Sequence, residues 1–594
     1  MIPTAEIKIN LTPALRLEQA LKAAGIEDAA SVRKLTIAGR LTADDCRYIR
    51  FKMHKTLQEL DISNATFNRK SIPGDGFADC IGLLSITFPA SIVIMDLYSK
   101  VEMDLLSLKS CRSLNNIAVH PDNPAFASEN GVLFNKDKTT LLLYPTGRRD
   151  DDVYVIPDTV VKIARFAFYF CHGLTSVFIP KSVRKIEFHV FNGCHNLTAV
   201  TVHPDNPKYA SENGILLNKY KTELIYYPEG RQGECIIPDK VETIGIWSFM
   251  GRRKGLTSIT FPASIEYSHR NINRFKDCVD LTAFLLHPDS PFVEDKGTVY
   301  RKPKVDGSFP YSVLYPTGRH GDFYIPAAVD YFPNIALKDC RNITSVTVHP
   351  DNKYFESENG IAFYSGKVRL KFCPRGKQGD CFIPASTTEL AEYSLENCFD
   401  LTSVTVHPDN PEFASENGVL FNKDKTEMIY FPEGWQGDYT IPETVTVIDL
   451  QNLEQAPGLT SISIHPDNTE YTSENGVLFY KDKTALALYP RGKKGDLFIP
   501  ASLIDDNIII DIFDCPGITS VTVPPDNPVY SSENGILFNK DKTKLIFCPE
   551  NMKADFTIPD SVVKIGYWFF TASDSYENIC DYHCYADFEN ADIW

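Results

Sequence analysis

Six histidines recur at one position of a repeated phrase, and their type and spacing suggest metal chemistry. Each precedes Pro-Asp, and the set is His120, His203, His287, His349, His407 and His465. A zinc ion needs its ligands about 2 Å away. If the copies stack as strands about 4.8 Å apart, histidines two or three strands apart lie about 10 to 15 Å from one another. The seventh copy has Pro524 instead, so we predict a structural turn and expect neither metal nor cofactor.

The cysteines also recur at one position, where a row of thiols could form disulfides or bind zinc. Eight of the 15 share a repeat column: Cys80, Cys111, Cys171, Cys194, Cys278, Cys340, Cys398 and Cys515. A cysteine in a core-facing column behaves as a small buried hydrophobe, and side chains pointing in parallel have poor disulfide geometry. We predict free buried thiols. In the tail, Cys580, His583 and Cys584 have no second cluster that would complete a zinc site.

Other chemistry finds little support in the chain. GxSxG, Walker and HExxH motifs are absent, and no acidic pair interrupts the repeat, so we expect no enzymatic activity. A net charge of -17 argues against nucleic-acid binding, which needs basic surface. No apolar run approaches the ~18 residues of a transmembrane helix, and no secretory leader is visible at the start. We expect a monomer.

A repeat must position these residues. The glycine of SENG, or of its drifted form EDKG, marks seven copies at Gly131, Gly214, Gly297, Gly360, Gly418, Gly476 and Gly535. A strand-like pattern closed by proline, such as LTSVFIP at 174–180, recurs within each copy, in steps of 24 or 25 and of 34 residues from Pro326 onward. Ordering 24 residues costs about 1.5 kcal/mol each, whereas four or five buried side chains return roughly 2 kcal/mol each. Only stacking closes that gap, so the pattern predicts a parallel β-solenoid.

The longer steps carry the opening phrase, which reads HPDNPAFASENGVLFNKDKTTLLLYPTG at 120–147. PDNP is typical of a turn, and Asn-Gly in SENG tolerates positive φ. GVLF and LLLYP, separated by NKDKT, predict two strands. We therefore expect an in-line β-hairpin in alternate rungs, with short helical turns such as 168–171 between strands.

The ends of the chain depart from this pattern. Residues 32–37 and 57–62 repeat the strand spacing without the proline, and helical patterns cover 11–24 and 42–53, where Thr42 and Asp45 form a capping box. We predict an α/β N-terminal cap with divergent repeats at 1–75. The solenoid, with rungs of 23–26 and 34–38 residues, covers 76–570, and 571–594 is a C-terminal tail or cap.

The rungs of the form LTSVxIPxSVxxIxxxxFxxCxxL, clearest at 174–197, and the SENGVLFNKDKT hairpins resemble the BspA-like leucine-rich repeat family over nearly the whole chain. This resemblance implies a β-rich, right-handed solenoid of the leucine-rich-repeat type, and a non-enzymatic cell-surface or secreted protein that binds host or bacterial proteins in adhesion. Two alternatives stay open. The 12% aromatic content and 28 tyrosines suggest surface-polysaccharide binding, whereas free thiols and no visible leader suggest an intracellular interaction scaffold.

One outward slot on the strands is the candidate ligand-binding stripe. In rungs of the LTS type this slot holds threonine, but in rungs re-entered from a hairpin it is apolar, and one further rung has phenylalanine there. The set is Val155, Phe178, Ile236, Tyr324, Phe382 and Phe498. An outward apolar stripe is either a surface for a protein or glycan partner or the seat of the inserted hairpin, and both interpretations stay open.

Overall fold

The computed structural model describes residues 5–67, 72, 76–93, 108, 110–149, 153–251, 254–266, 275–301, 313–337, 340–505, 512, 515–549, 559, 561–562 and 564–565. The chain forms two compact units. Unit 1 comprises Met1–Glu294, Val299–Lys302 and Ser312–Arg319, and unit 2 comprises Asp295–Thr298, Pro303–Tyr311 and His320–Trp594. The predicted tail at 571–594, with its two cysteines and histidine, lies outside the described residues.

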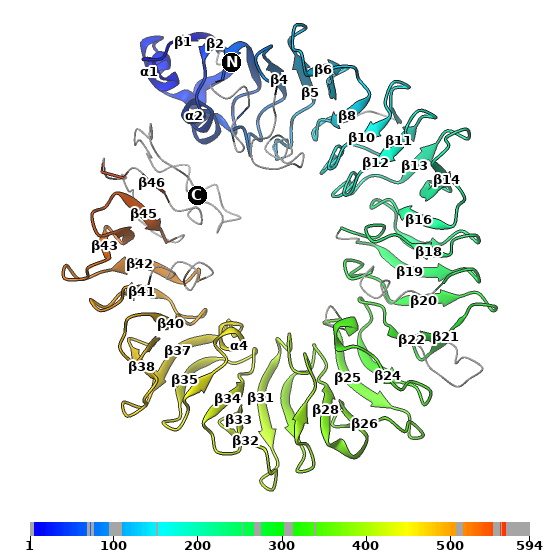
Figure 1. Cartoon of the computed structure of the whole chain (residues 1–594), viewed down its shortest axis with the longest axis vertical. Coiled ribbons are helices and arrows are strands. Elements are labelled where there is room, and N and C mark those ends of the chain that lie inside the picture. The colour runs from blue at the N-terminus through cyan, green and yellow to red at the C-terminus, as the bar shows by residue number, and fades with distance from the viewer. Residues whose placement is uncertain are drawn as a thin grey trace. The chain divides into compact units, whose positions relative to one another are not determined.

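Parallel strands stack rung upon rung within each unit, which confirms the predicted β-solenoid (Figure 1). In unit 1 the parallel sheets are β1(Ala5–Leu11)-β2(Val32–Arg40)-β3(Glu59–Thr66)-β4(Ser85–Phe88)-β5(Asn116–Val119), β9(Tyr154–Val155)-β11(Ser176–Ile179)-β13(Ala199–Val202) and β17(Gly233–Ile236)-β19(Leu256–Phe261)-β20(Ala283–Leu286). In unit 2 the pairs are β24(Gly321–Ile325)-β25(Ile343–Val348), β29(Gly379–Ile383)-β31(Leu401–Val406), β35(Gly437–Ile441)-β37(Leu459–Ile464) and β41(Gly495–Phe498)-β42(Ile518–Thr522). The strands alternate between buried and outward side chains, as the period of two requires.

The repeated phrase forms a three-stranded antiparallel meander rather than the predicted two-stranded hairpin. In the first copy β6(Phe126–Glu129), β7(Val132–Asn135) and β8(Thr140–Leu143) follow one another, and β8 then pairs in parallel with β10(Lys162–Ile163). The turn at SENG, with Asn130 at φ 50° and Gly131 at φ 78°, joins the first two strands. The sequence did not reveal β6, because FASE lacks the apolar–polar alternation that marks a strand, and its four residues are all half-buried.

The other meanders have the same order, although the third and sixth differ in strand length. They are β14(Tyr209–Glu212)-β15(Ile215–Asn218)-β16(Glu223–Tyr226), β21(Phe292–Asp295)-β22(Thr298–Arg301)-β23(Val313–Leu314), β26(Phe355–Glu358)-β27(Ile361–Tyr364)-β28(Arg369–Phe372), β32(Phe413–Glu416)-β33(Val419–Asn422)-β34(Glu427–Tyr430), β38(Tyr471–Glu474)-β39(Val477–Tyr480)-β40(Leu486–Leu488) and β43(Tyr530–Glu533)-β44(Ile536–Asn539)-β45(Lys544–Phe547). Short return strands complete the rungs: β12(Lys185–Ile186), β18(Thr243–Ile244), β30(Glu389–Leu390), β36(Val447–Ile448) and β46(Lys564–Ile565).

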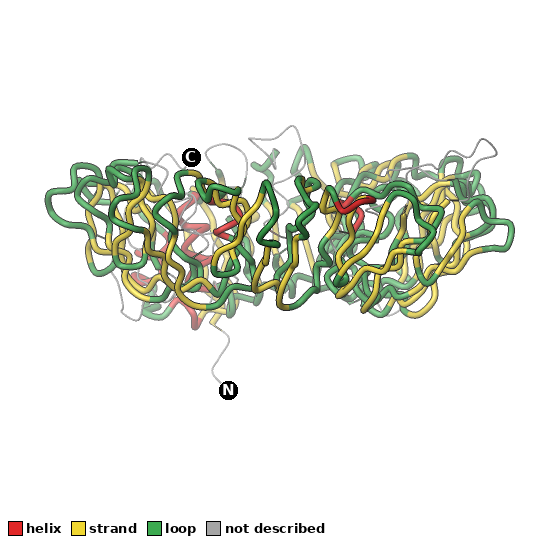
Figure 2. The backbone as a smooth tube through the Cα atoms, turned by 90° about the horizontal axis from the view of Figure 1, so that it is seen from below, coloured by secondary structure: helices red, strands yellow, loops and turns green. Residues whose placement is uncertain are grey.

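Helices are few and short in the described chain, which consists mainly of strands and loops (Figure 2). They are α1(Leu17–Ala23), α2(Ala43–Met53) and α4(Leu450–Glu454), with 3₁₀ turns η1(Ala29–Ser31), η3(Asn334–Leu337) and η4(Ser365–Lys367). No helix among the described residues is long and apolar enough to cross a membrane.

Each meander covers the edge of the parallel sheet that precedes it. In unit 1 the amide of Val200 donates to the carbonyl of Gly214 at 2.9 Å, and the amide of Val202 donates to Ser211 Oγ at 2.9 Å. In unit 2 Val404 and Val406 make the same bonds to Gly418 and Ser415. An uncovered edge would expose backbone donors to other chains. SENG therefore ends one sheet before the next begins.

The asparagine of PDN, present in six of the seven copies, fastens its meander to the rung before it. Asn410 is fully buried, and its Nδ2 donates to the carbonyls of Pro384 and Thr387, both at 2.8 Å. Its Oδ1 accepts from the amides of Glu412 at 2.9 Å and Phe413 at 2.7 Å. The same kind of four-bond arrangement occurs at Asn123, Asn206, Asn468 and Asn527. The amide uses its two donor hydrogens and both acceptor lone pairs, which explains why the phrase repeats this residue.

The cysteine column lies in the core, as predicted. Twelve of the thirteen described cysteines are buried, Cys548 is half-buried, and all thirteen are free thiols. Cys194 donates its thiol to the carbonyl of Phe168 in the preceding rung, with 2.8 Å between sulfur and oxygen. Burial raises the pKa of Cys194 well above its usual value, so the thiol stays protonated and unreactive.

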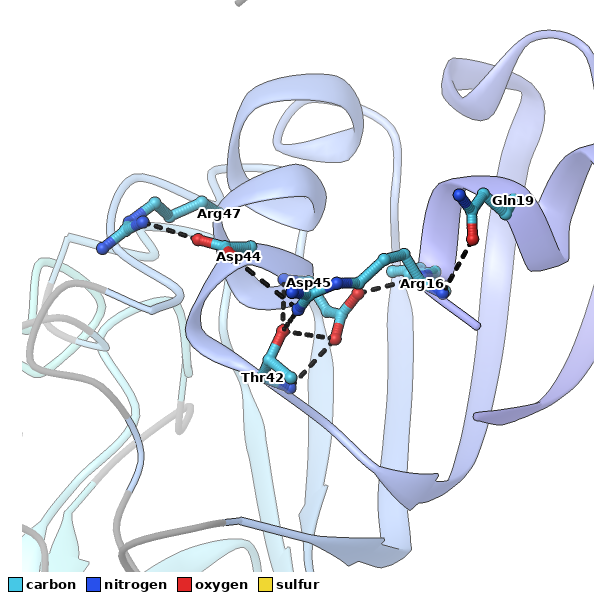
Figure 3. A network of polar contacts seen from close by, with 7 residues as sticks. Arg16, Gln19, Thr42, Asp44, Asp45 and Arg47 are labelled. Carbon is cyan, nitrogen blue, oxygen red and sulfur yellow. Dashed lines mark hydrogen bonds and ion pairs between the residues drawn. The ribbon is translucent and has the colours of Figure 1, made fainter. Parts of the chain in front are cut away.

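The helix predicted at 42–53 and its capping box are confirmed (Figure 3), whereas the helix predicted at 11–24 covers only Leu17–Ala23, because Leu11 ends strand β1. Thr42 Oγ1 accepts from the amide of Asp45, and Asp45 Oδ2 accepts from the amide of Thr42 at 2.9 Å. The other carboxylate oxygen, Oδ1, accepts from the amide of Leu17 at the start of α1, also at 2.9 Å. Arg16 Nη1 donates to Thr42 Oγ1 at 2.9 Å. One buried carboxylate thus caps two helices and fixes them to each other.

Candidate ligand-binding surface

The histidines of the phrase serve the turn, as predicted from their spacing. In each of the six copies that have histidine, Nδ1 accepts a hydrogen bond from the amide of the aspartate two residues later, for example at 3.2 Å between His407 and Asp409. This bond fixes both the ring and the turn. Within the part of the chain that the structure describes, no group of three or more His, Cys, Asp or Glu side chains could hold a metal ion.

The charged residues of the phrase also pair with one another. Lys138 Nζ lies 2.6 Å from Glu129 Oε2 across the first meander, and Lys221 Nζ lies 2.7 Å from Glu212 Oε2 in the second. The lysine two positions earlier reaches the turn, and Lys136 Nζ donates to the carbonyl of Pro121 at 2.9 Å. These repeated charges therefore hold the rung together and do not form an acid–base pair.

In unit 1 two short rows of outward side chains form apolar patches. The register of β9, β11 and β13 aligns Val155 with Phe178 and Phe178 with Thr201, and Val155 is 59% exposed. We call this row strand patch A. The register of β17, β19 and β20 aligns Ile236 with Thr260 and Thr260 with Leu285.

This second row is strand patch B. Ile236 is 61% exposed and Leu285 is 46% exposed. Sequence reasoning missed Leu285, because it looked for apolar residues in rungs re-entered from a hairpin. The available signal was leucine in LTAFLLHP, where LTSVTVHP places threonine.

In unit 2 the predicted residues stand apart from one another. Tyr324, Phe382 and Phe498 each lie beside a threonine of the next strand, namely Thr347, Thr405 and Thr522. Phe382 and Phe498 are half-buried. No two predicted residues of unit 2 are therefore adjacent in register, whereas Val155 and Phe178 of unit 1 are.

Tyr324 is a seat for the meander. Its side chain is only 6% exposed, and Lys296 Nζ lies 4.0 Å from its ring centroid. Thr298 Oγ1 donates to the carbonyl of Tyr324 at 2.6 Å. Of the two interpretations left open for this slot, Tyr324 fits the hairpin seat, because the turn between β21 and β22 folds over the ring.

Buried ionisable groups occupy the position after the proline that closes a meander. Glu433 is buried, its Oε1 accepts from the amide of Asn397 at 2.9 Å, and burial raises its pKa to about 7. Arg375, in the same position one copy earlier, donates to the carbonyl of Tyr393 at 2.8 Å. Glu433 bonds to the backbone of the preceding rung and Arg375 bonds to that of the next rung, which is a structural role.

Residues 153–228 and 223–290 match the family profile described as BspA type Leucine rich repeat region (6 copies). Similar solved structures include a leucine-rich repeat protein from Eubacterium ventriosum, with 17% identity, 73% of this chain and 86% of that chain covered, and a TM-score of 0.30. Pneumococcal vaccine antigen PcpA has 12% identity, coverage of 88% and 84%, and a TM-score of 0.24. A leucine rich cell surface protein from Faecalibacterium prausnitzii has 15% identity, coverage of 68% and 96%, and a TM-score of 0.24. The comparison with curated proteins gave no match.

Proposed function

We propose, from the premise that this chain is a leucine-rich repeat protein with BspA-type repeats, that it is a non-enzymatic interaction protein whose outward strand residues bind a protein partner. The BspA-type resemblance also implies that it acts at the cell surface or in secreted form, in adhesion to host or bacterial proteins. The partner contacts the strand face, where adjacent rungs place variable side chains side by side.

One observation carries this proposal: strand patches A and B contain the exposed apolar side chains Val155, Ile236 and Leu285 in a slot where other rungs have threonine. Rungs of the LTS type commonly hold threonine in this slot, and several of these hydroxyls bond within the sheet. Thr405 donates to Asp380 at 2.8 Å and Thr522 donates to Asp496 at 2.9 Å. Val155, Ile236 and Leu285 replace these internally hydrogen-bonded hydroxyls with exposed apolar side chains. Clustered exposed hydrocarbon of this kind marks interaction surfaces.

The energetic scale suits an anchor within a larger interface. A stable protein interface buries about 800 Å² on each partner, more than three rungs about 4.8 Å apart provide. A few central residues carry most of the binding free energy of such an interface. We therefore expect the patches to act as anchors, while the surrounding polar strand face provides shape complementarity to the partner.

The test uses threonine, which the fold already accepts in this slot. We would screen the full chain against host matrix proteins and glycans, beside the triple variant Val155→Thr, Ile236→Thr and Leu285→Thr. Losing about 1 kcal/mol for each of the three anchors should weaken binding of a protein ligand by roughly 100-fold. Threonine suits a strand, so we expect an unchanged melting temperature.

The control is Tyr220→Asp, which removes an exposed aromatic ring from a meander tip where other copies have aspartate. It should leave the affinity unchanged. A protein ligand that binds the triple variant as tightly as the parent contradicts the proposal. If only glycans bind the parent chain, and the triple variant no longer binds them, the result would favour the surface-polysaccharide alternative. Surface labelling of intact cells of the source organism separates surface placement from the intracellular scaffold.

A further inference from the structure

We propose that a cluster of aromatic and imidazole rings on the turn side of unit 1 is a binding site for a neutral saccharide, separate from strand patches A and B. The cluster comprises Phe166, Tyr169, Phe170, His172, His189 and His195, and we call it the ring cluster. It occupies the turns that follow the return strands β10 and β12. The sequence prediction assigned these turns no function.

The rings touch one another in a continuous chain across two successive rungs. Phe166 stacks on His189 with 5.4 Å between centroids and 13° between planes. His172 stacks on His195 at 5.5 Å and 24°. Both pairs join residues 23 apart, so one rung repeats the surface of the other. Within the first rung Tyr169 lies between Phe166 and Phe170, at 5.1 and 4.4 Å from their rings.

Phe170 has a backbone conformation that its residue type disfavours. Its φ is 54°, and it immediately precedes a cysteine of the repeat column. Other rungs place Asp79, Gly193 or Asn397 in this slot, also at positive φ, and these types tolerate that conformation. A bulky residue at positive φ is an outlier. Backbone strain of this kind is concentrated at binding and catalytic sites.

The neighbouring rung accommodates the strained ring. A Cβ atom on Gly193 would lie 2.7 Å from Phe170 Cδ1, so glycine makes room for it. The amide of Phe170 donates to the carbonyl of Asn192 at 2.9 Å. The side chain is nevertheless 37% exposed. Strain and an adjacent glycine thus combine to present a phenyl ring at the surface.

Buried polar groups hold the imidazoles in place. Glu229 has no exposed side-chain surface, and its Oε2 lies 3.0 Å from His195 Nδ1. Its other oxygen accepts from the amide of Gly193 at 3.0 Å. Asn192 Nδ2 lies 3.1 Å from His189 Nδ1. Such support from a second layer of residues pre-organises a site and lowers the entropic cost of binding.

The chemistry and size of the ring cluster favour a sugar. A sugar ring offers a hydrocarbon face that packs on aromatic rings, and hydroxyls that bond to imidazole, phenol and amide groups beside them. Two adjacent turns, about 4.8 Å apart, match one or two sugar rings but fall far short of the roughly 800 Å² that a protein partner buries.

The ring cluster suits an uncharged ligand near pH 7. His172 faces His195 and Arg112, and burial together with these neighbours lowers its pKa. His189 faces Arg165, and burial and that arginine lower its pKa. Both rings are therefore neutral at pH 7. Acidification below the lowered pKa of His172 would place a positive charge on this stacked ring and weaken the platform for a neutral sugar.

The experiment compares Phe170→Asn with Tyr393→Asn in the full chain. Asparagine already stands at positive φ in the equivalent slot of Asn397, so the first variant should keep or raise the melting temperature. Tyr393 is an exposed ring at φ 59° outside the ring cluster and is the matched control. An array of neutral and acidic oligosaccharides first identifies the ligand, which we expect to be neutral. Calorimetry at pH 7.5 then measures its affinity for the parent and both variants. The affinity should fall at least 10-fold in Phe170→Asn and stay at the parent value in Tyr393→Asn.

The outcomes separate this proposal from the strand-face function. The triple variant Val155→Thr, Ile236→Thr and Leu285→Thr should bind the saccharide normally. The proposal is overturned if no oligosaccharide binds at millimolar concentration, or if both asparagine variants lose affinity equally. Binding that strengthens on acidification would identify an anionic ligand instead. Loss of a protein ligand in Phe170→Asn would assign the ring cluster to a protein interface. Both results overturn the inference.

Discussion

At the residue scale, a buried asparagine in most copies forms the hydrogen bonds that hold the meander to the preceding rung. Asn410 satisfies two carbonyls and two amides in adjacent segments of chain. The third copy has Ser290 instead, whose Oγ accepts from the amide of Phe292 at 3.2 Å. A serine has one hydroxyl donor, where asparagine has two amide donors. The third meander is therefore held to its neighbouring rung by fewer bonds.

We predict that Asn410→Ala lowers the free energy of unfolding by about 2 to 4 kcal/mol, because it leaves buried polar groups without partners. The reverse change, Ser290→Asn, should raise it by about 1 kcal/mol. Denaturant unfolding measures both changes. Hydrogen exchange at the amides of Glu412 and Phe413 reports the local effect. A loss below about 0.5 kcal/mol for Asn410→Ala, the range of ordinary surface substitutions, would contradict this role.

A second prediction at this scale concerns Glu433, whose pKa is raised by burial to about 7. An unfolded glutamate has a pKa near 4.3, so the folded state binds the proton more tightly. The free energy of unfolding should be highest below that value and fall by about 3 kcal/mol as the pH rises through 7. Glu433→Gln keeps an oxygen for the amide of Asn397 and removes the charge. It should match the parent at pH 4.5 and be more stable at pH 8.

Denaturant unfolding at the two pH values checks this, with the exposed Glu427→Gln as the control in the same meander. An equal difference between Glu433→Gln and the parent at both pH values would show that the carboxyl does not titrate across this range.

At the scale of elements, the SENG turn acts as an edge cover. Gly418 has φ 81°, and its carbonyl accepts from the amide of Val404 at 2.7 Å. A Cβ atom there would lie 2.9 Å from Ser403 Cβ. The turn must therefore lie directly on the strand it covers. Glycine is required for close approach as well as for positive φ.

We predict that Gly418→Ala costs about 2 to 3 kcal/mol, the sum of backbone strain and a forced shift of the meander. Gly379→Ala is the control, because Gly379 has φ 75° but no atom within 4 Å of the position that an added Cβ would take. It should cost only the conformational part, about 1 kcal/mol. Denaturant unfolding compares the two. Equal costs would mean that the contact with Ser403 contributes nothing.

At the scale of the whole molecule, residues that recur from copy to copy have structural roles, and residues that depart from the repeat are the candidates for ligand binding. The histidine, asparagine, glutamate and lysine of the phrase all bond within or between rungs. Departures from the repeat remain as candidates for recognition. Strand patches A and B depart from threonine, and the ring cluster departs from Gly, Asn or Asp at Phe170. Distant sites that share no partners act additively, which is why one set of variants can test each surface without disturbing the other.

The sequence alone determined the features that depend on period and local chemistry. A strand pattern every 24 or 34 residues requires stacked parallel strands, because one rung cannot stabilise itself. The Asn-Gly turns, the Thr42–Asp45 capping box and the buried cysteine column also follow from residue type and spacing. Each of these features involves residues close in sequence, or a column that recurs with every rung.

Only the tertiary structure decided which side chains of different rungs meet. It paired FASE with GVLF, placed the SENG turn against the preceding strand, covered Tyr324 and exposed Leu285. It also stacked Phe166 on His189 across 23 residues. These outcomes depend on how far each meander folds over its neighbour. That distance is set by contacts between rungs, such as Lys296 over Tyr324. The residue pattern within a single rung does not predict these contacts.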